Sequence, residues 1–190
     1  YRFRLIEDID LVDAPGLWIP DFRGAEFDGA GHTISNLSVN LPFAAFVGMF
    51  GTLSSTTTVR SLGVVGGSVI GLENVGGLVG DNRGAISDSY ATANVSGTTS
   101  VGGLVGSSTG PISNSYATGN VTDSGNGGGF FGDSGGFGGL VGSGGRISNS
   151  HATGKVNGTY NVGGLVGSSG EISNSYATGN VSGTDNVGGL

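Results

Sequence analysis

Acidic side chains that could serve as a general acid and a general base cluster near the start of the chain. Glu7, Asp8, Asp10 and Asp13 lie close together, and enzymes that cleave polysaccharides commonly use paired carboxylates. Later in the chain acidic residues are scarce and fall at different places in the sequence pattern: Asp88, Glu171 and Asp185. The simpler interpretation of the early cluster is a solvated, charged edge that discourages unwanted strand pairing. We therefore expect no enzyme, and a polysaccharide-acting one is only a distant alternative.

Residues that could bind a metal or a cofactor are widely dispersed. His32 and His151 are far apart, and His151 stands where related segments have tyrosine. Asp123 and Asp133, in a Gly-rich stretch, are the only candidates for calcium ligands. No Gly-Lys-Ser/Thr follows any Gly-rich stretch, so there is no phosphate loop. We expect no metal and no cofactor.

Two side-chain types recur at fixed places and would form outward columns if the segments stack. The tyrosine column is Tyr90, Tyr116, His151 and Tyr176, and the threonine column is Thr92, Thr118, Thr153 and Thr178. A flat threonine column suggests ice binding, but any accurate repeat makes columns and threonine is ordinary on exposed strands. Because tyrosine occupies the neighbouring outward position, ice binding is a less favoured alternative.

These columns follow from an internal repeat. One sequence, Ile-Ser-Asn-Ser-Tyr-Ala-Thr-Gly-Asn-Val or a close variant, occurs four times, at 86–95, 112–121, 147–156 and 172–181. A Gly-Gly-Leu-Val-Gly block precedes each copy, at 75–80, 101–106, 137–142 and 162–167. A period near 25 residues indicates a stacked repeat architecture.

The composition supports strands and turns rather than helices. Glycine accounts for 42 of 190 residues, and no stretch shows an apolar stripe of helical period. One coil cannot bury its apolar side alone, so successive coils must stack. The sequence predicts a parallel β-solenoid (β-helix) of about seven coils, roughly 25 residues each. The expected inward residues are Ile112, Ser115, Ala117 and Val121, with Leu104 and one valine of the block.

We expect a single solenoid over residues 1–190. It has irregular, charged coils at 1–45, degenerate repeats at 46–85 and regular repeats at 86–190. The blocks recur at intervals of 26, 36, 25 and 25 residues, so an inserted loop is expected at 123–136. Phe130 and Phe131 in that loop are a candidate partner contact, unless both rings fold back onto the solenoid wall.

Charge and composition limit the partners. A net charge of -7 makes nucleic acid an unsuitable partner, and the longest apolar stretch is too short to span a bilayer. The absence of cysteine excludes disulfides and fits a large surface protein. The chain begins with Tyr1, which is compatible with a removed leader.

The repeated block resembles the GLUG motif, whose Gly-Leu-any-Gly signature is seen here as Gly-Leu-Val-Gly followed by Ile-Ser-Asn-Ser-Tyr-Ala-Thr-Gly. The early segments 3–11, 18–20 and 27–39 resemble the lead-in of the same surface proteins. The resemblance, to secreted bacterial adhesins similar to filamentous haemagglutinin, implies a right-handed β-helix at the cell exterior. It implies no catalytic residue and no particular ligand.

The expected function is therefore a rigid structural or adhesive segment, secreted or on the cell surface, that meets a protein or glycan ligand. The alternative is a self-assembling filament. A fifth block begins at Val187 and stops at Leu190, which predicts either a longer array or an open edge that docks on another subunit.

Overall fold

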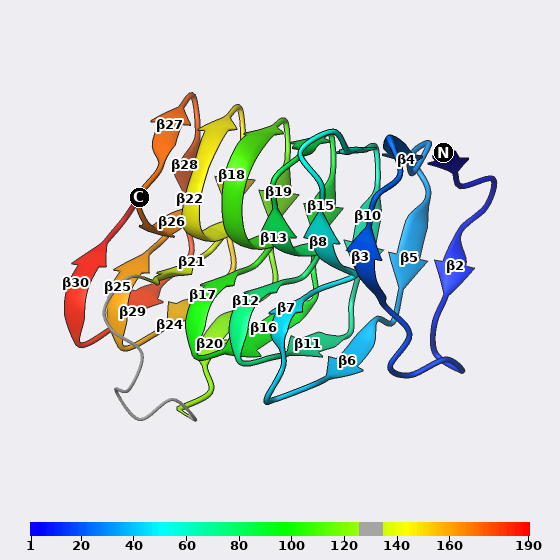
Figure 1. The fold of residues 1–190 in the computed structure, drawn as a ribbon. Helices are drawn as coiled ribbons and strands as arrows, with labels where there is room; N and C mark the ends of the chain where they lie inside the picture. The colour runs from blue at the N-terminus through cyan, green and yellow to red at the C-terminus, as the bar shows by residue number, and fades with distance from the viewer. Residues whose placement is uncertain (126–134) are drawn as a thin grey trace.

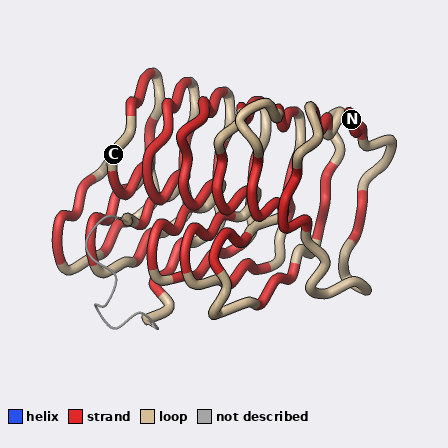
Figure 2. Tube along the Cα trace, in the orientation of Figure 1, coloured by secondary structure: helices blue, strands red, loops and turns tan. Residues whose placement is uncertain are grey.

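The computed structural model describes residues 1–125 and 135–190 and shows a parallel β-solenoid there, without a helix (Figure 2). The chain makes about seven turns of about 26 residues each, which confirms the predicted fold class. The coils follow one another along a single axis, with the two chain ends at opposite ends (Figure 1). Phe130 and Phe131 lie outside the described residues.

Four parallel sheets form the walls of the solenoid. Sheet A contains β1 (Arg2–Arg4), β3 (Ile19–Phe22), β4 (Glu26–Asp28), β8 (Phe50–Leu53), β9 (Thr58–Arg60), β13 (Val79–Asn82), β14 (Ala85–Ser87), β18 (Val105–Ser113), β22 (Val141–Ser148), β26 (Val166–Ser168) and β27 (Glu171–Ser173). Sheet B contains β2 (Ile9–Asp10), β5 (Thr33–Ser35), β10 (Gly63–Val65), β15 (Tyr90–Ala91), β19 (Tyr116–Ala117), β23 (His151–Ala152) and β28 (Tyr176–Ala177).

The other two walls have six strands each. Sheet C contains β6 (Ser38–Asn40), β11 (Ser68–Ile70), β16 (Asn94–Gly97), β20 (Val121–Asp123), β24 (Val156–Asn157) and β29 (Val181–Ser182). Sheet D contains β7 (Ala45–Val47), β12 (Glu73–Gly76), β17 (Thr99–Gly102), β21 (Phe137–Gly138), β25 (Tyr160–Gly163) and β30 (Asp185–Gly188). The strands are short because each coil turns a corner every few residues.

The register places equivalent residues of successive repeats side by side. Tyr90 pairs with Tyr116, and Val95 pairs with Val121. Val101 pairs with Phe137 although the interval between them is the long one. The extra residues therefore fall between β20 and β21 and leave the pairing on both sides unchanged. An insertion inside a strand would instead have exchanged its inner and outer faces.

The interior consists of columns of apolar side chains. The predicted inward residues are all buried, at 1% exposure or less: Leu104, Ile112, Ser115, Ala117 and Val121. One expectation was wrong, because Val101 and Val105, both valines of the block, are fully buried rather than one. They belong to β17 and β18, and the corner between these strands resets the alternation of faces.

The glycines of the block let the coils approach closely. A Cβ on Gly103 would lie 2.3 Å from the carbonyl oxygen of Gly139, and one on Gly139 would lie 2.2 Å from that of Gly164. Real Cβ atoms do not come so near to backbone oxygen. Glycine is therefore required at this corner by the stacking itself rather than by a positive φ.

The second serine of each repeat forms a buried hydroxyl ladder. The Ser115 hydroxyl donates to the carbonyl of Ser113 (2.7 Å) and accepts from the backbone N–H of Ser89 in the preceding coil (3.2 Å). Ser150 does the same for Ser115, and Ser175 for Ser150. Each hydroxyl thus satisfies a backbone N–H at a corner where the strands are interrupted.

We predict that Ser115→Ala lowers the free energy of unfolding by about 1–3 kcal/mol, because the buried N–H of Ser89 loses its acceptor. The outward Ser113→Ala is the matched control and should change stability by less than about 0.5 kcal/mol. Urea denaturation followed by circular dichroism measures both. Equal midpoints for the two variants would contradict the ladder's role.

Candidate functional site: the outer columns and a groove

The tyrosine column forms a continuous stack of rings on the outer face of sheet B. The ring centroids of Tyr90 and Tyr116 are 4.7 Å apart, those of Tyr116 and His151 5.0 Å, and those of His151 and Tyr176 5.1 Å. The planes are within 9° of parallel. The strands hold identical positions one coil apart, so flat rings on neighbouring coils must stack. Their polar edges form a row that a partner could contact.

The environment of this stack changes the acidity of one phenol. Burial raises the pKa of Tyr116, and neighbouring Tyr90 adds to the effect. At the other side of Tyr90, a Cβ on Gly63 would lie 2.5 Å from the tyrosine Cζ. The first ring of the stack therefore lies directly over a glycine, which has no side chain to displace it.

The threonine column lies beside the rings, directly after the strands of sheet B. Thr118, Thr153 and Thr178 are exposed, whereas Thr92 is half-buried. The Thr92 hydroxyl accepts a hydrogen bond from the backbone N–H of Gly66 at 2.7 Å. The outer surface at this corner thus presents phenol, imidazole and hydroxyl groups in regular rows.

The early carboxylates tie the first coil to the second. Asp8 accepts a hydrogen bond from the backbone N–H of Thr33 (2.8 Å), and this bond is the main cause that lowers the pKa of Asp8. Asp10 accepts from the Asn36 amide (2.7 Å), which is the main cause that lowers the pKa of Asp10. A general acid needs a raised pKa instead. These two carboxylates therefore have structural partners, and Glu7 and Asp13 are exposed.

The candidate metal ligands do not come together. His32 lies 3.3 Å from Asp8, measured from its Nδ1 to the carboxylate Oδ1, and His151 belongs to the aromatic stack on later coils. Asp123 accepts hydrogen bonds from the Thr159 hydroxyl and from the backbone N–H of Gly125. Over residues 1–125 and 135–190, His, Asp and Glu form no cluster of three that could hold an ion. Asp133 is outside those ranges.

Two of the four candidate contact residues lie on the last coil. Val187 is 49% exposed and Leu190 is 60% exposed. They are separate from the aromatic stack, which is on another wall. Phe130 and Phe131, the other two, fall outside the described residues. Within the described part of the chain, no helix is long and apolar enough to cross a membrane.

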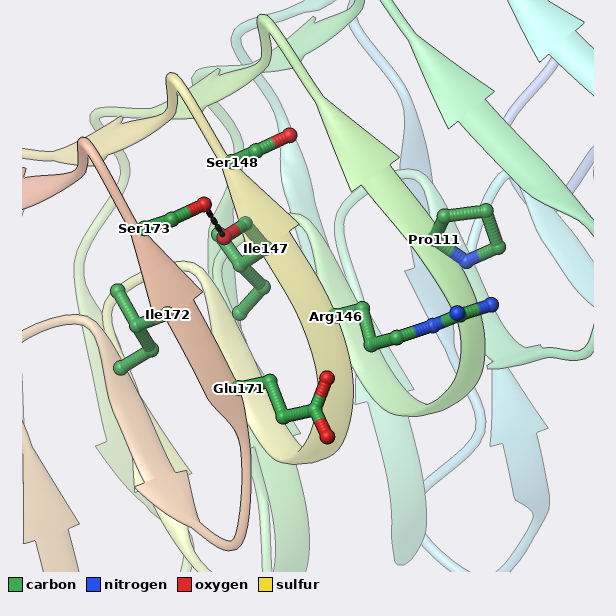
Figure 3. A pocket seen from close by; sticks show the side chains of 7 residues that line it. All are labelled: Pro111, Arg146, Ile147, Ser148, Glu171, Ile172 and Ser173. Atoms are coloured by element: carbon green, nitrogen blue, oxygen red, sulfur yellow. Dashed lines mark hydrogen bonds between the residues drawn. The ribbon is translucent and has the colours of Figure 1, made fainter.

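Sequence reasoning missed a groove on the outer face of sheet A (Figure 3). It has a volume of about 360 Å³ and crosses β18, β22 and β27, and it is lined by Pro111, Arg146, Ile147, Ser148, Glu171, Ile172 and Ser173. The residue before each repeat isoleucine points outward here, and it is variable: Ala85, Pro111, Arg146 and Glu171. That variation within an otherwise constant repeat was the signal that could have revealed it.

The comparisons with known proteins agree with the repeat. The GLUG motif family matches residues 71–96, 97–122, 132–157 and 158–182, together more than half of the chain. Over 69 residues the chain is 41% identical to halomucin of Haloquadratum walsbyi (strain DSM 16790 / HBSQ001). That stretch is 36% of the chain and 1% of halomucin, so the chain spans only a small piece of this relative. No solved structure matches.

We predict that the solenoid loses stability as the pH rises above about 10, the pKa of tyrosine in an unfolded chain. Since the folded-state pKa of Tyr116 is raised, its contribution is fully present below that value and disappears as the pH passes the folded-state pKa. Thermal unfolding midpoints measured across this range should fall less steeply in Tyr116→Phe. Tyr1→Phe, which alters a side chain that is 99% exposed, is the control. Identical slopes for wild type and Tyr116→Phe would contradict the prediction.

Proposed function

Because the chain belongs to the GLUG-motif family, we propose that it is a non-catalytic structural and adhesive segment of an extracellular or cell-surface protein. The segment is a rigid rod whose regular outer columns contact a protein or glycan surface. The likeness to halomucin over 69 residues supports a structural role at the cell surface. The resemblance of the repeat to the adhesins similar to filamentous haemagglutinin supports adhesion.

The observation that carries the proposal is the aromatic stack on sheet B. Three tyrosine rings, the imidazole of His151 and the neighbouring threonines follow one another on consecutive coils, with ring centroids 4.7 to 5.1 Å apart. A row of equal, weak contacts is suited to a repetitive or extended partner, because the attachments reinforce one another once the first has formed. A single deep pocket would be suited to a small substrate instead.

Rigidity follows from the interior. Each coil is joined to the next by main-chain hydrogen bonds along all four walls, and the core columns run through successive coils. Such a rod bends little and so keeps a fixed distance between the regions at its two ends, because each coil is packed against its neighbours. Asp8 and Asp10, two of the carboxylates whose pKa is lowered, join the first coil to the second through hydrogen bonds to Thr33 and Asn36.

We predict that beads coated with the chain adhere to surfaces displaying extracellular polysaccharide or surface protein. Replacing Tyr116 and Tyr176 together by serine should reduce the number of adherent beads several-fold, since two rings of the row are lost. Asn40→Ala, on an exposed position of sheet C, is the matched control and should leave adhesion unchanged. Equal adhesion of coated and uncoated beads would refute the proposal, and release of sugar from the polysaccharide would refute its non-catalytic part.

A second candidate is end-to-end assembly into filaments. Parallel strands that pair through the main chain from coil to coil can pair in the same way with strands of another copy. If this assembly occurs, electron microscopy of the concentrated chain shows fibres, and changing Val187 and Leu190 to aspartate abolishes them. Thr118→Asp, which adds charge on an outer wall, is the control. A chain that sediments as a monomer at high concentration would exclude filaments.

A further inference from the structure

The basic side chains of this acidic chain are nearly all neutralised by its own carboxylates. Of the seven, five form ion pairs within the part of the chain that the structure describes: Arg2, Arg4, Arg23, Arg60 and Arg83. Arg60 is the best satisfied, with Glu26 at 2.6 Å and Asp28 at 2.7 Å. Arg146 and Lys155 have no such partner among the described residues, and Arg146 lines the groove on sheet A.

Arg146 lacks an ion pair even though a carboxylate is one coil away. Arg146 of β22 is in register with Glu171 of β27, just as Arg60 is in register with Asp28 on the same sheet. The Arg60 guanidinium lies 2.7 Å from the Asp28 carboxylate. The Arg146 side chain instead extends toward Pro111 and away from Glu171 (Figure 3). A guanidinium group and a carboxylate therefore border the groove separately, and each is available to a ligand.

The remaining lining of the groove is rich in hydroxyl groups. Ser148 and Ser173 face outward in register. Within the described part of the chain, the Ser173 hydroxyl makes a single, long hydrogen bond, 3.4 Å to the carbonyl oxygen of Ile147. The Ser148 hydroxyl has no hydrogen-bond partner among residues 1–125 and 135–190. Pro111 adds an apolar ring at one side. The volume of about 360 Å³ is near the lower end of small-molecule sites and leaves room for one or two sugar rings.

We propose that this groove binds a carboxylate-bearing sugar unit, a uronic acid, within an acidic glycan. The planar guanidinium of Arg146 binds the sugar carboxylate through two parallel hydrogen bonds. The Glu171 carboxylate accepts hydrogen bonds from ring hydroxyls, and Ser148 and Ser173 exchange hydrogen bonds with the others. Because the groove is open along the sheet, a glycan chain lies across it and extends beyond it. This inference rests on the proposed adhesive function and names its ligand class.

The Glu171 carboxylate makes the groove selective among the anions that Arg146 attracts. A sulfate group offers no hydroxyl for the Glu171 carboxylate and is repelled by it, and a doubly charged phosphate is repelled by Glu171 more strongly than a single carboxylate is. A sugar that carries one carboxylate and several hydroxyls satisfies both charged side chains at once. An acidic peptide satisfies Arg146 but leaves Glu171 beside another carboxylate.

The test is calorimetric titration of the folded chain with a short oligogalacturonate, compared with the neutral galactose oligomer of equal length. We expect binding of the acidic oligomer only, weakened about tenfold or more by Arg146→Gln, because a charge-assisted hydrogen-bond pair is lost. Glu171→Gln should weaken it less. Lys155→Gln removes the other unpaired cation and is the matched control, expected to bind like wild type. Circular dichroism verifies that each variant is folded.

Equal binding of the neutral oligomer, or equal affinity of wild type and Arg146→Gln, overturns the inference. So does equally tight binding of oligoglutamate or inorganic phosphate, which would make the groove a general anion site. Bead adhesion separates this inference from the proposed function. Beads that adhere while the chain does not bind oligogalacturonate overturn only the groove, and loss of adhesion with oligogalacturonate binding intact overturns only the adhesive role.

Discussion

Backbone N–H and C=O groups must find partners at every corner of a solenoid, where the strands that would pair them are interrupted. In this chain the constraint is met by the neighbouring coil. The Ser115 hydroxyl accepts the N–H of Ser89 while it donates to its own chain at Ser113. Outside the same corner, the Asn114 amide donates to Asp88 of the coil before it. A coil is therefore complete only when another coil lies against it.

This dependence explains why the repeat is so exact. The buried hydroxyl meets an N–H one coil away, so the serine recurs at the same place in the four regular repeats. The coil before them has Leu62 at this position, and its N–H donates to the Ser89 hydroxyl. Close stacking also requires glycine at Gly103 and Gly139, where a Cβ would collide with the carbonyl of the next coil. Positions that point outward have no such requirement. They still form columns, because an outward residue always meets its own equivalent.

Outer columns have different chemistry depending on which side chains the register brings together. In the early coils of sheet A, Arg60 forms ion pairs with both Glu26 and Asp28, so its charge is neutralised. On sheet B, identical rings stack and raise the pKa of Tyr116 through burial. In the late coils of sheet A, Arg146 and Glu171 are in register but form no ion pair, and both line the groove. The same geometry thus yields a closed charge network, a packed aromatic surface and an open polar site.

The inside of the coils could be predicted from the repeat, and Ile112, Ser115 and Ala117 are buried as expected. The prediction failed for the block, where Val101 and Val105 are both buried, because alternation along one strand does not carry across a corner. The repeat reveals that the outward residue before each isoleucine varies, which marks the place of the groove. It does not reveal that Arg146 and Glu171 stay apart there, because this depends on the directions that their side chains take.

The sequence by itself determined the period, the coil length and which residues recur together, because an exact repeat leaves a stacked solenoid as the way to bury its apolar positions. Tertiary structure alone decided which outward neighbours interact. Strand register sets the distance between their backbones, but side-chain rotamers determine whether two opposite charges form an ion pair. Arg60 and Asp28 form one, whereas Arg146 and Glu171 remain apart. The physical reason is that close packing in the interior allows each inner side chain a single conformation. Side chains that face solvent can adopt several conformations.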